Sequence, residues 1–347
     1  MENKIFTSSN LKKIYRMNEK YKSIKTLYNA EERGDIPTAE RIARGKVMVR
    51  AWTEEQLPEI GSKFGFLSKP KKQIIFSTFV QKGGVLKTTL SFNVARSLAL
   101  NGIKTLIVGL DSECSITDVL LPRAEIFNIE ETSQTLGLFH VIAEKADISE
   151  VIRKTSLPTL DIIPETHDLV VLNKWINNKQ RREYIFDSLL IPQLKDYEVI
   201  IFDNCPSWNH LIENSIVAST VIVLPLGCNI LAYNACETNL STILEFQKIM
   251  GLNNQKLIML PTLLEKSSLS HQIFAKYLSR FSSFIIPSAI RKSVKGEEAL
   301  IHRQTIFEYS PTAPLADDYF DILKTMWSII NEEERVKSNE KITMDLV

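Results

Sequence analysis

One segment of the chain, residues 79–89 with the sequence FVQKGGVLKTT, restricts the possible folds more than any other. It follows a run of apolar residues, 74–80, that is typical of a buried strand. It precedes residues 88–101, where apolar side chains recur at helical spacing up to an Asn-Gly pair that suits a helix end. A glycine pair between a strand and a helix, flanked by two lysines, is typical of a loop that binds phosphate. The sequence therefore predicts a strand, a phosphate-binding loop and a helix in direct succession.

Further short apolar runs alternate with helical patterns along the rest of the chain. They span residues 105–110, 199–202, 221–224 and 257–260. Continuous runs rich in β-branched residues suit strands that are buried on both faces of a parallel sheet. We therefore expect an α/β fold with a doubly wound, mostly parallel sheet of the P-loop NTPase kind.

Two observations exclude other classes of protein. The four cysteines form no C-x-x-C pair, which argues against a zinc ribbon, an iron–sulfur cluster or a disulfide framework and favours a reducing cytoplasm. Residues 214–236 carry no charge, but the polar residues and the proline within them argue against a bilayer-spanning helix. We expect a cytoplasmic protein that does not use a membrane.

The first fifth of the chain differs from the rest in charge. Residues 1–72 contain 16 Lys and Arg against 9 Asp and Glu, a balance of +7, whereas the whole chain is only +1. This asymmetry indicates a separate module with an anionic partner, although a solvated surface would also explain it. Helical patterns, a basic alternating ribbon at 44–50 and a capping box at 53–56 favour a winged helix-turn-helix-like module. We expect a DNA-binding region at 1–70, a nucleotide-binding domain at 71–330 and a polar tail at 331–347, with residues 68–72 as the linker.

The residues of the loop suit particular parts of a nucleotide. Gly83 and Gly84 allow the backbone to approach phosphate closely. Lys87 can place its ammonium on the β- and γ-phosphates, and the hydroxyl of Thr88 can ligate Mg²⁺. Asp203 follows four apolar residues and would stand at the carboxyl end of its strand, where Mg²⁺ would sit.

The pattern K-G-G-V-x-K-T-T resembles the deviant Walker A loop of the ParA/MinD ATPases. The resemblance implies that Lys82 is the signature lysine, which reaches across an ATP-sandwiched dimer, and that Lys82, Lys87 and Asp111 are catalytic. It implies ATP or ADP and Mg²⁺ as cofactors, with Thr88, Asp111 and Asp203 as the metal-binding residues. The residues expected to contact the nucleotide are Gln81, Lys82, Gly83, Gly84, Val85, Leu86, Lys87, Thr88, Thr89 and Pro287.

This sequence departs from the family pattern at a few positions. Leu86 stands where several branches of the family have glycine, and Gln81 replaces the first glycine of the standard phosphate loop. The family's switch aspartate is usually followed by Pro-Gln, whereas Asp111 is followed by Ser112 and Glu113.

The chain is most similar to the larger plasmid partition ATPases of the ParA and SopA type, which carry an N-terminal DNA-binding domain. The resemblance implies a homodimer on ATP, binding to double-stranded DNA both at an operator and non-specifically, and stimulation by a ParB-like centromere-binding protein. It also implies repression of the chain's own operon and association with the nucleoid. The candidate DNA-binding residues are Lys22, Lys25, Arg41, Arg44, Lys46 and Arg50 near the N-terminus, and Arg291, Lys292, Lys295 and Arg303 in the ATPase domain.

Three other functions use similar nucleotide-binding domains. A MinD-type membrane ATPase should end in a basic amphipathic helix, and residues 341–347 are too short and mixed for one. A nitrogenase-iron-like reductase needs cluster cysteines, whereas these cysteines suit core positions better. A nucleotide-sensing repressor with vestigial hydrolysis is the alternative that stays open.

Overall fold

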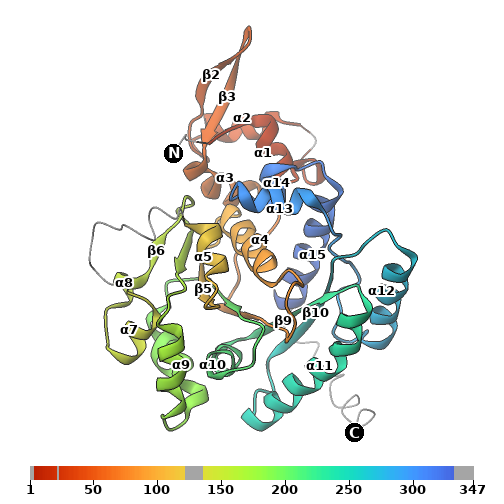
Figure 1. Ribbon diagram of the computed structural model, residues 1–347. Coiled ribbons are helices and arrows are strands. Elements are labelled where there is room, and N and C mark those ends of the chain that lie inside the picture. The colour runs from red at the N-terminus through yellow and green to blue at the C-terminus, as the bar shows by residue number, and fades with distance from the viewer. Residues whose placement is uncertain (1–3, 22, 122–135, 332–347) are drawn as a thin grey trace.

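The structure is a computed structural model that describes residues 4–21, 23–121 and 136–331. Its central sheet contains β4 (Ile74–Thr78), β5 (Thr105–Leu110), β6 (Arg153–Lys154), β7 (Leu160–Ile163), β8 (Val199–Asn204), β9 (Val221–Gly227) and β10 (Lys256–Thr262). Their order in space is β10–β9–β4–β8–β5–β7–β6, and all neighbours are parallel except β6 and β7 (Figure 1). The predicted α/β fold with a mostly parallel sheet is confirmed.

Helices cover both faces of this sheet (Figure 1). They are α4 (Lys87–Leu100), α5 (Ser115–Leu120), α7 (Leu138–Ala143), α8 (Ile148–Val151), α9 (Leu169–Asn177), α10 (His210–Ala218), α11 (Ile230–Met250), α12 (Ser268–Arg280), α13 (Val294–Ile301), α14 (Ile306–Tyr309) and α15 (Pro314–Asn331). Apolar side chains of α4 and α15 form one cluster against the sheet, and those of α9, α10, α11 and α12 form clusters on the other face.

The central strands show why continuous apolar runs fit this fold. In β8, Val199 and Ile201 pack into the cluster with α4, whereas Ile200 and Phe202 pack into the cluster on the opposite face. Successive residues of a strand point to opposite faces, so a strand covered on both sides needs apolar residues at every position.

The N-terminal segment forms a small antiparallel sheet with helices, separate from the central sheet. It contains β1 (Ile5–Thr7), α1 (Ser8–Ile14), α2 (Lys25–Glu32), β2 (Glu40–Arg44), β3 (Val47–Thr53) and α3 (Leu57–Phe64). The three strands form an antiparallel sheet in the order β1–β3–β2. The β2–β3 hairpin turns at Gly45, whose φ of 63° is a conformation that glycine adopts without strain, and it projects from the molecule (Figure 1). The ribbon expected at 44–50 is part of this hairpin.

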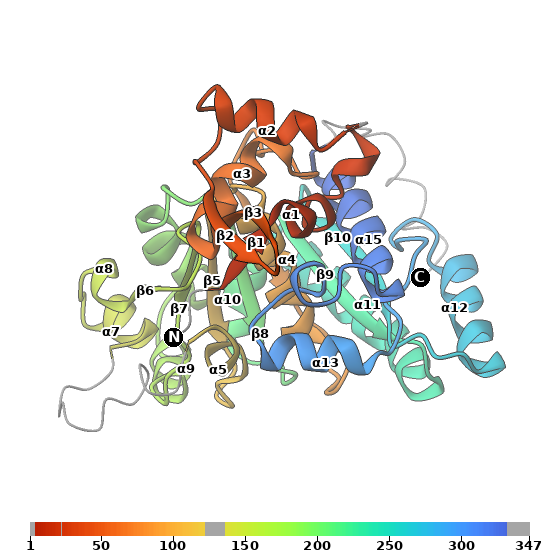
Figure 2. The ribbon, with the colours of Figure 1, turned by 90° about the horizontal axis from the view of Figure 1, so that it is seen from above.

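This segment packs directly on the domain that follows it (Figure 2). Side chains from α1, α3, α4, α14 and α15 belong to one hydrophobic cluster. Helix α3 approaches α4 so closely that a Cβ added at Gly61 would lie 1.7 Å from the carbonyl oxygen of Leu100. The Tyr15 hydroxyl donates a hydrogen bond to the carbonyl of Leu57 (2.5 Å) inside this contact.

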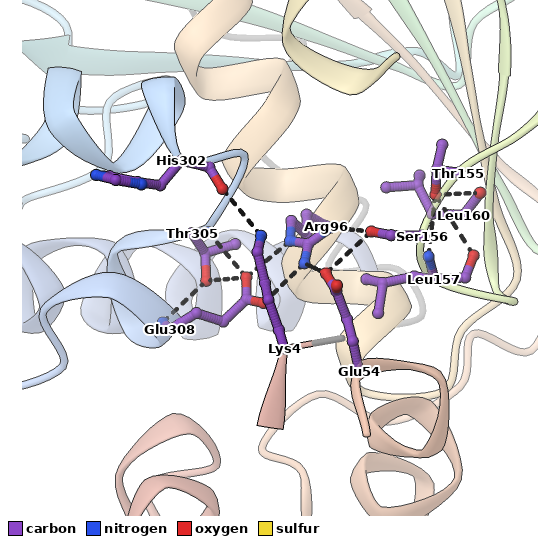
Figure 3. A network of polar contacts seen from close by, with 10 residues as sticks. All are labelled: Lys4, Glu54, Arg96, Thr155, Ser156, Leu157, Leu160, His302, Thr305 and Glu308. Atoms are coloured by element: carbon purple, nitrogen blue, oxygen red, sulfur yellow. Dashed lines mark hydrogen bonds and ion pairs between the residues drawn. The ribbon is translucent and has the colours of Figure 1, made fainter. Parts of the chain in front are cut away.

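A buried polar network joins the same parts of the chain (Figure 3). Arg96 of α4 is almost fully buried and donates two hydrogen bonds, of 2.7 and 2.8 Å, to the carboxylate of Glu308 on α14. Its guanidinium also pairs with Glu54, which follows β3, and contacts the Ser156 hydroxyl (3.3 Å). Lys4 donates to the carbonyl of His302 (2.9 Å) beside this network.

Strands β6 and β7 were not predicted from the sequence. The apolar run of β7 is short and interrupted by Asp161, which is buried and accepts hydrogen bonds from Lys154 of β6 (2.7 Å) and the Tyr197 hydroxyl (2.7 Å). A charged residue at a buried strand position becomes acceptable only when it has such partners, and no short apolar pattern predicts them.

Candidate nucleotide and magnesium site

The phosphate-binding loop lies between the carboxyl end of β4 and the first turn of α4. Two contacts from other elements hold it. The Asn239 side chain of α11 accepts a hydrogen bond from the Gln81 N–H (2.7 Å), and the Thr262 hydroxyl of β10 donates one to the carbonyl of Val85 (3.1 Å). Because Asn239 and Thr262 are both buried, the loop is anchored to the interior at each of these points.

The backbone around the start of α4 favours an anionic ligand. The first amides of a helix have no acceptor in a preceding turn, and the N-cap residue of this helix, Leu86, makes no capping hydrogen bond with its side chain. Their N–H groups and the helix dipole together attract negative charge. Leu86 stands just before the helix with φ 69° and ψ 31°, a left-handed conformation that only glycine adopts without strain. A Cβ added at Gly83 or Gly84 would meet no atom of the described residues within 4 Å, so among these residues the space beside the loop is open.

Lys87 is the buried cation of the loop. Its ammonium donates a hydrogen bond to the carbonyl oxygen of Lys82 (2.8 Å). Burial lowers the pKa of Lys87, and the nearby carboxylates of Asp203 and Asp111 act in the opposite direction. Lys82 itself is half-buried. The two lysines therefore lie on one loop in different surroundings.

Asp203 lies at the end of β8 and is completely buried. Its Oδ1 accepts a hydrogen bond from the Ser91 hydroxyl of α4 (2.7 Å), whereas its Oδ2 is buried with no hydrogen-bond partner among the described residues. Burial raises the pKa of Asp203 and outweighs the opposite effect of the Ser91 and Thr88 hydroxyls and the Lys87 ammonium, so that the pKa is about 6. A buried carboxylate oxygen without a partner needs a cation or a proton.

These oxygens fit Mg²⁺. Asp203 supplies a free carboxylate oxygen, and the Thr88 hydroxyl lies close enough to influence the pKa of that carboxylate. Within the described ranges, no group of three or more His, Cys, Asp or Glu side chains could hold a metal ion alone. A magnesium ion at Asp203 would therefore depend on hydroxyl, phosphate and water oxygens, which suits its usual coordination in nucleotide sites.

Asp111 follows β5 at the same edge of the sheet. The parallel register pairs Gly109 of β5 with Asp203 of β8, so Asp111 begins the loop just beyond that level. Its side chain is half-exposed, and its Oδ1 accepts a hydrogen bond from the Glu113 N–H (3.1 Å). The structure thus places Lys87, Asp111 and Asp203 around one site, as expected for a phosphate-binding edge.

The sequence profile of an AAA domain family matches residues 72–259, which include this loop and both aspartates. The chain belongs to that family. This family and the similar proteins described next support the assignment of the chain as a P-loop ATPase of the ParA/MinD type.

Individual proteins show the extent of the similarity. The chain is 29% identical over 247 residues to the sporulation initiation inhibitor protein Soj of Bacillus subtilis. The aligned region covers 70% of this chain and 94% of that protein. A crystal structure of a plasmid partition protein from Borrelia burgdorferi superimposes with a TM-score of 0.60 at 18% identity, covering 75% of this chain and all of that one. A complex of Cyanothece McdA with ATP gives a TM-score of 0.64 at 16% identity, covering 77% and 99%. The two structures show the fold alone.

The candidate DNA-binding residues of the N-terminal segment differ in their contacts. Arg41, Arg44 and Lys46 are exposed on the β2–β3 hairpin, and Lys25 is exposed at the start of α2. Arg50 is instead held by the Glu31 carboxylate (2.5 Å), and its guanidinium lies 3.9 Å from the ring centre of Tyr28. Lys22 lies outside the described residues.

The candidates near the C-terminus of the ATPase domain are also partly engaged. Arg291 pairs with Asp318 (2.6 Å) and Lys292 with Glu265 (2.8 Å). Arg303 donates to the carbonyl of Leu121 (3.2 Å). Lys295 is exposed on α13, and Pro287 is exposed in the segment that runs beside β10.

Several residues of the site were not found from the sequence. Asn239 and Thr262 hold the loop from elements far along the chain. Glu165 follows β7, is only 3% exposed, and lies at the same sheet edge as Asp203. Burial, together with the charge of Asp203, raises the pKa of Glu165 to about 8. No local pattern marks these residues, because Asn239 meets the loop through the packing of α11, and Thr262 and Glu165 are placed by the register of the sheet.

Proposed function

We propose that this chain is an ATP-dependent DNA-partition ATPase of the larger ParA type. The observation that carries the proposal is the loop with two lysines, Lys82 and Lys87, beside a buried aspartate that has one unpaired oxygen. The similarity to Soj of Bacillus subtilis and the fold shared with a plasmid partition protein of Borrelia burgdorferi support a role in partition.

Each residue of the site has a role in this proposal. The amides of residues 81–89 and the Lys87 ammonium bind the ATP phosphates, and the exposed segment at Pro287 contacts the nucleotide from the side of β10. Thr88 and Asp203 hold Mg²⁺, assisted by Asp111, and the ion neutralises phosphate charge when it is bound. Asp111 orients the attacking water from the adjacent strand end. Lys82 reaches the nucleotide of a second copy, which makes ATP part of a homodimer interface.

The basic surfaces provide two ways to bind double-stranded DNA. The N-terminal segment, read as a winged helix-turn-helix-like module, recognises an operator through its hairpin and through α2, and so represses the chain's own operon. Arg291, Lys292, Lys295 and Arg303 bind nucleoid DNA non-specifically in the ATP state. A ParB-like centromere-binding protein stimulates hydrolysis and releases the dimer into the cytoplasm. Within the part of the chain that the structure describes, no helix is long and apolar enough to cross a bilayer.

The test compares Asp111→Ala and Asp203→Ala with the unaltered full-length chain. Asp111→Ala should still bind ATP, dimerise and remain on DNA, because Thr88 and Asp203 still hold the Mg²⁺ and the main loss is the positioning of water. Asp203→Ala should lose the Mg²⁺ dependence of nucleotide binding. Sedimentation with ATP or ADP, and phosphate release with DNA, measure these outcomes. Unaltered turnover in Asp111→Ala would contradict the assigned role, and absence of ATP binding by the unaltered chain would contradict the proposal itself.

A nucleotide-sensing repressor with weak hydrolysis is the second candidate. One observation favours it: the segment after Asp111 is Ser112-Glu113, and its Glu113 N–H occupies an oxygen of the aspartate. Steady-state hydrolysis with saturating DNA and the centromere-binding partner separates the two functions. A rate that stays at the background level while ATP still changes operator binding would favour the repressor.

A further inference from the structure

Glu165 extends across the sheet toward the magnesium-binding aspartate. It stands two residues beyond Ile163, which is the last residue of β7. Its side chain covers Gly109 of the neighbouring β5, where an added Cβ would lie 2.3 Å from Cγ of Glu165 and 2.7 Å from Cδ. Gly109 is paired in parallel register with Asp203 of β8. Paired residues of parallel strands face the same side, so the Glu165 carboxyl lies about one strand spacing, ~5 Å, from the Asp203 strand on the same face.

The same residue holds the segment that follows Asp111. Glu165 Oε2 accepts a hydrogen bond from the Thr117 N–H (3.1 Å), and the Glu165 N–H donates one to the Thr117 hydroxyl (2.9 Å). The Cys114 thiol donates to the Glu165 carbonyl (3.6 Å), and the Cys114 N–H donates to the Asp111 carbonyl (3.0 Å). The chain from Asp111 to Thr117 is therefore fastened to Glu165 at both Cys114 and Thr117.

Two buried carboxylates at this edge each keep one oxygen without a partner. Glu165 Oε1 and Asp203 Oδ2 are both buried and make no hydrogen bond among the described residues. An unpaired buried oxygen is costly, and two on one face of the sheet need a proton, an external donor or a cation. Mg²⁺ usually keeps several water ligands, and outer groups that accept hydrogen bonds from those waters orient the site.

We propose that Glu165 is a positioning residue that accepts a hydrogen bond, at Oε1, from a water ligand of the Mg²⁺ held by Asp203. The inference rests on the proposed function, because it assumes that Mg²⁺ and nucleotide bind at Asp203. Since the other oxygen of Glu165 holds Thr117, cation binding is coupled to the position of the segment that carries Asp111. Glu165 touches neither the nucleotide nor the metal and acts through this water and through Thr117.

A purely structural role makes a different prediction for Glu165→Gln. The amide oxygen of glutamine can still accept the Thr117 N–H, so the start of α5 stays capped and the variant should fold. Its NH₂ group would face Asp203 as a donor and could not accept a hydrogen bond from a metal-bound water. Glu165→Gln therefore separates the hydrogen bond to Thr117 from the contact with the cation.

The experiment titrates Mg²⁺ at fixed ADP and follows nucleotide binding to the full-length chain by calorimetry. In Glu165→Gln, the Mg²⁺ concentration for half-maximal effect should rise about 10- to 100-fold, the usual loss on removing such an outer group. ADP binding in EDTA should not change. Asp161→Asn is the matched control, because it alters a buried carboxylate within β7, four residues before Glu165, and it should leave the Mg²⁺ dependence unchanged.

Hydrogen exchange supplies a readout that does not depend on turnover. Mg²⁺ with ADP should protect the amides of residues 112–117 in the unaltered chain and fail to do so in Glu165→Gln. Identical Mg²⁺ titrations and identical protection in the two proteins would overturn the role of Glu165 and leave the proposed function intact. A chain that binds no nucleotide under any of these conditions would overturn the proposed function, and this inference with it.

Discussion

The two lysines of the phosphate-binding loop differ in what surrounds their ammonium groups. Lys87 begins α4, is buried, and already donates to the carbonyl of Lys82. Its charge therefore points into the loop, where phosphate oxygens can replace or join that carbonyl. Lys82 is half-buried and stands directly before the glycine pair, which is exposed. In the proposed function its side chain reaches a second molecule, whereas the buried Lys87 serves the loop of its own chain.

Substitution of each lysine should therefore have a different effect. Lys87→Ala should weaken ATP binding by the monomer about 10- to 100-fold, since it removes a charged hydrogen bond to phosphate. Lys82→Ala should change monomer affinity much less but reduce ATP-dependent dimerisation and turnover. Nucleotide titration at low protein concentration and sedimentation at high concentration measure the two effects separately. If Lys82→Ala dimerises and hydrolyses ATP like the unaltered chain, its role across the interface is wrong.

At the scale of secondary structure, α4 is linked through the ion pairs of Arg96 to elements near both ends of the chain. Arg96 links this helix to Glu308 of α14 and to Glu54, which follows β3 (Figure 3). Burial alone would raise the pKa of Glu308, but the Arg96 guanidinium outweighs it and holds the pKa below the ordinary value. The helix that begins at the phosphate-binding loop is thus fixed relative to α14 and the N-terminal segment.

Removal of the central cation should destabilise the chain strongly. Arg96→Leu leaves two carboxylates without their partner and should cost about 3–5 kcal/mol in the free energy of unfolding. The pH dependence should also change. A glutamate whose pKa is lowered by folding stabilises the protein above its ordinary pKa, about 4.5, and that contribution is lost as pH falls through the lowered value. In Arg96→Leu the buried carboxylates lack a cation, so burial should raise their pKa above 4.5, and acidification from neutral pH towards about 4.5 should stabilise the variant as they become neutral.

Urea unfolding at a series of pH values measures both effects. Arg280→Leu is a suitable control, because it breaks an exposed ion pair with Glu237 and should change stability little. Equal losses in the two variants would show that the buried network does not stabilise the contact between α4 and α14.

At the scale of the whole molecule, the basic N-terminal segment and the ATPase domain share one hydrophobic cluster. The backbone of Gly61 in α3 lies against the carboxyl end of α4 at Leu100. Deletion of residues 1–70 would therefore expose apolar side chains of α4 and α15 to water, in addition to removing the hairpin. A test of DNA binding is cleaner when it leaves this packing intact.

Exposed side chains of the β2–β3 hairpin allow such a test. The triple change Arg41→Ala, Arg44→Ala and Lys46→Ala should abolish an operator footprint while ATP binding and thermal stability stay unchanged. The slope of log K against log salt for operator DNA should fall by about 0.9 for each lost phosphate contact. Lys295→Ala on α13 is the matched variant and should weaken ATP-dependent binding to random DNA only. A triple variant that still protects a specific operator would place the sequence-reading surface elsewhere.

The sequence by itself determined the features that depend on neighbouring residues. Short patterns predict the phosphate-binding loop, the helix after it and the apolar strands on either side. Backbone geometry over a few residues and burial on both faces each require particular residue types at neighbouring positions. Asp203 could be predicted for the same reason, since it directly follows an apolar run at the end of its strand. Asp111 also follows an apolar run, but its role was predicted from the family resemblance.

Only the tertiary structure decided which distant side chains complete the site. Glu165 reaches toward Asp203 because three strands are held in parallel register and the middle one has a glycine at that level. Arg96 is an ordinary helical residue in sequence and becomes the centre of a network only when α14 and the end of β3 meet it. Such contacts join residues from 42 to 212 positions apart, and no periodicity in the chain records them. The register of the sheet and the packing of the helices create them.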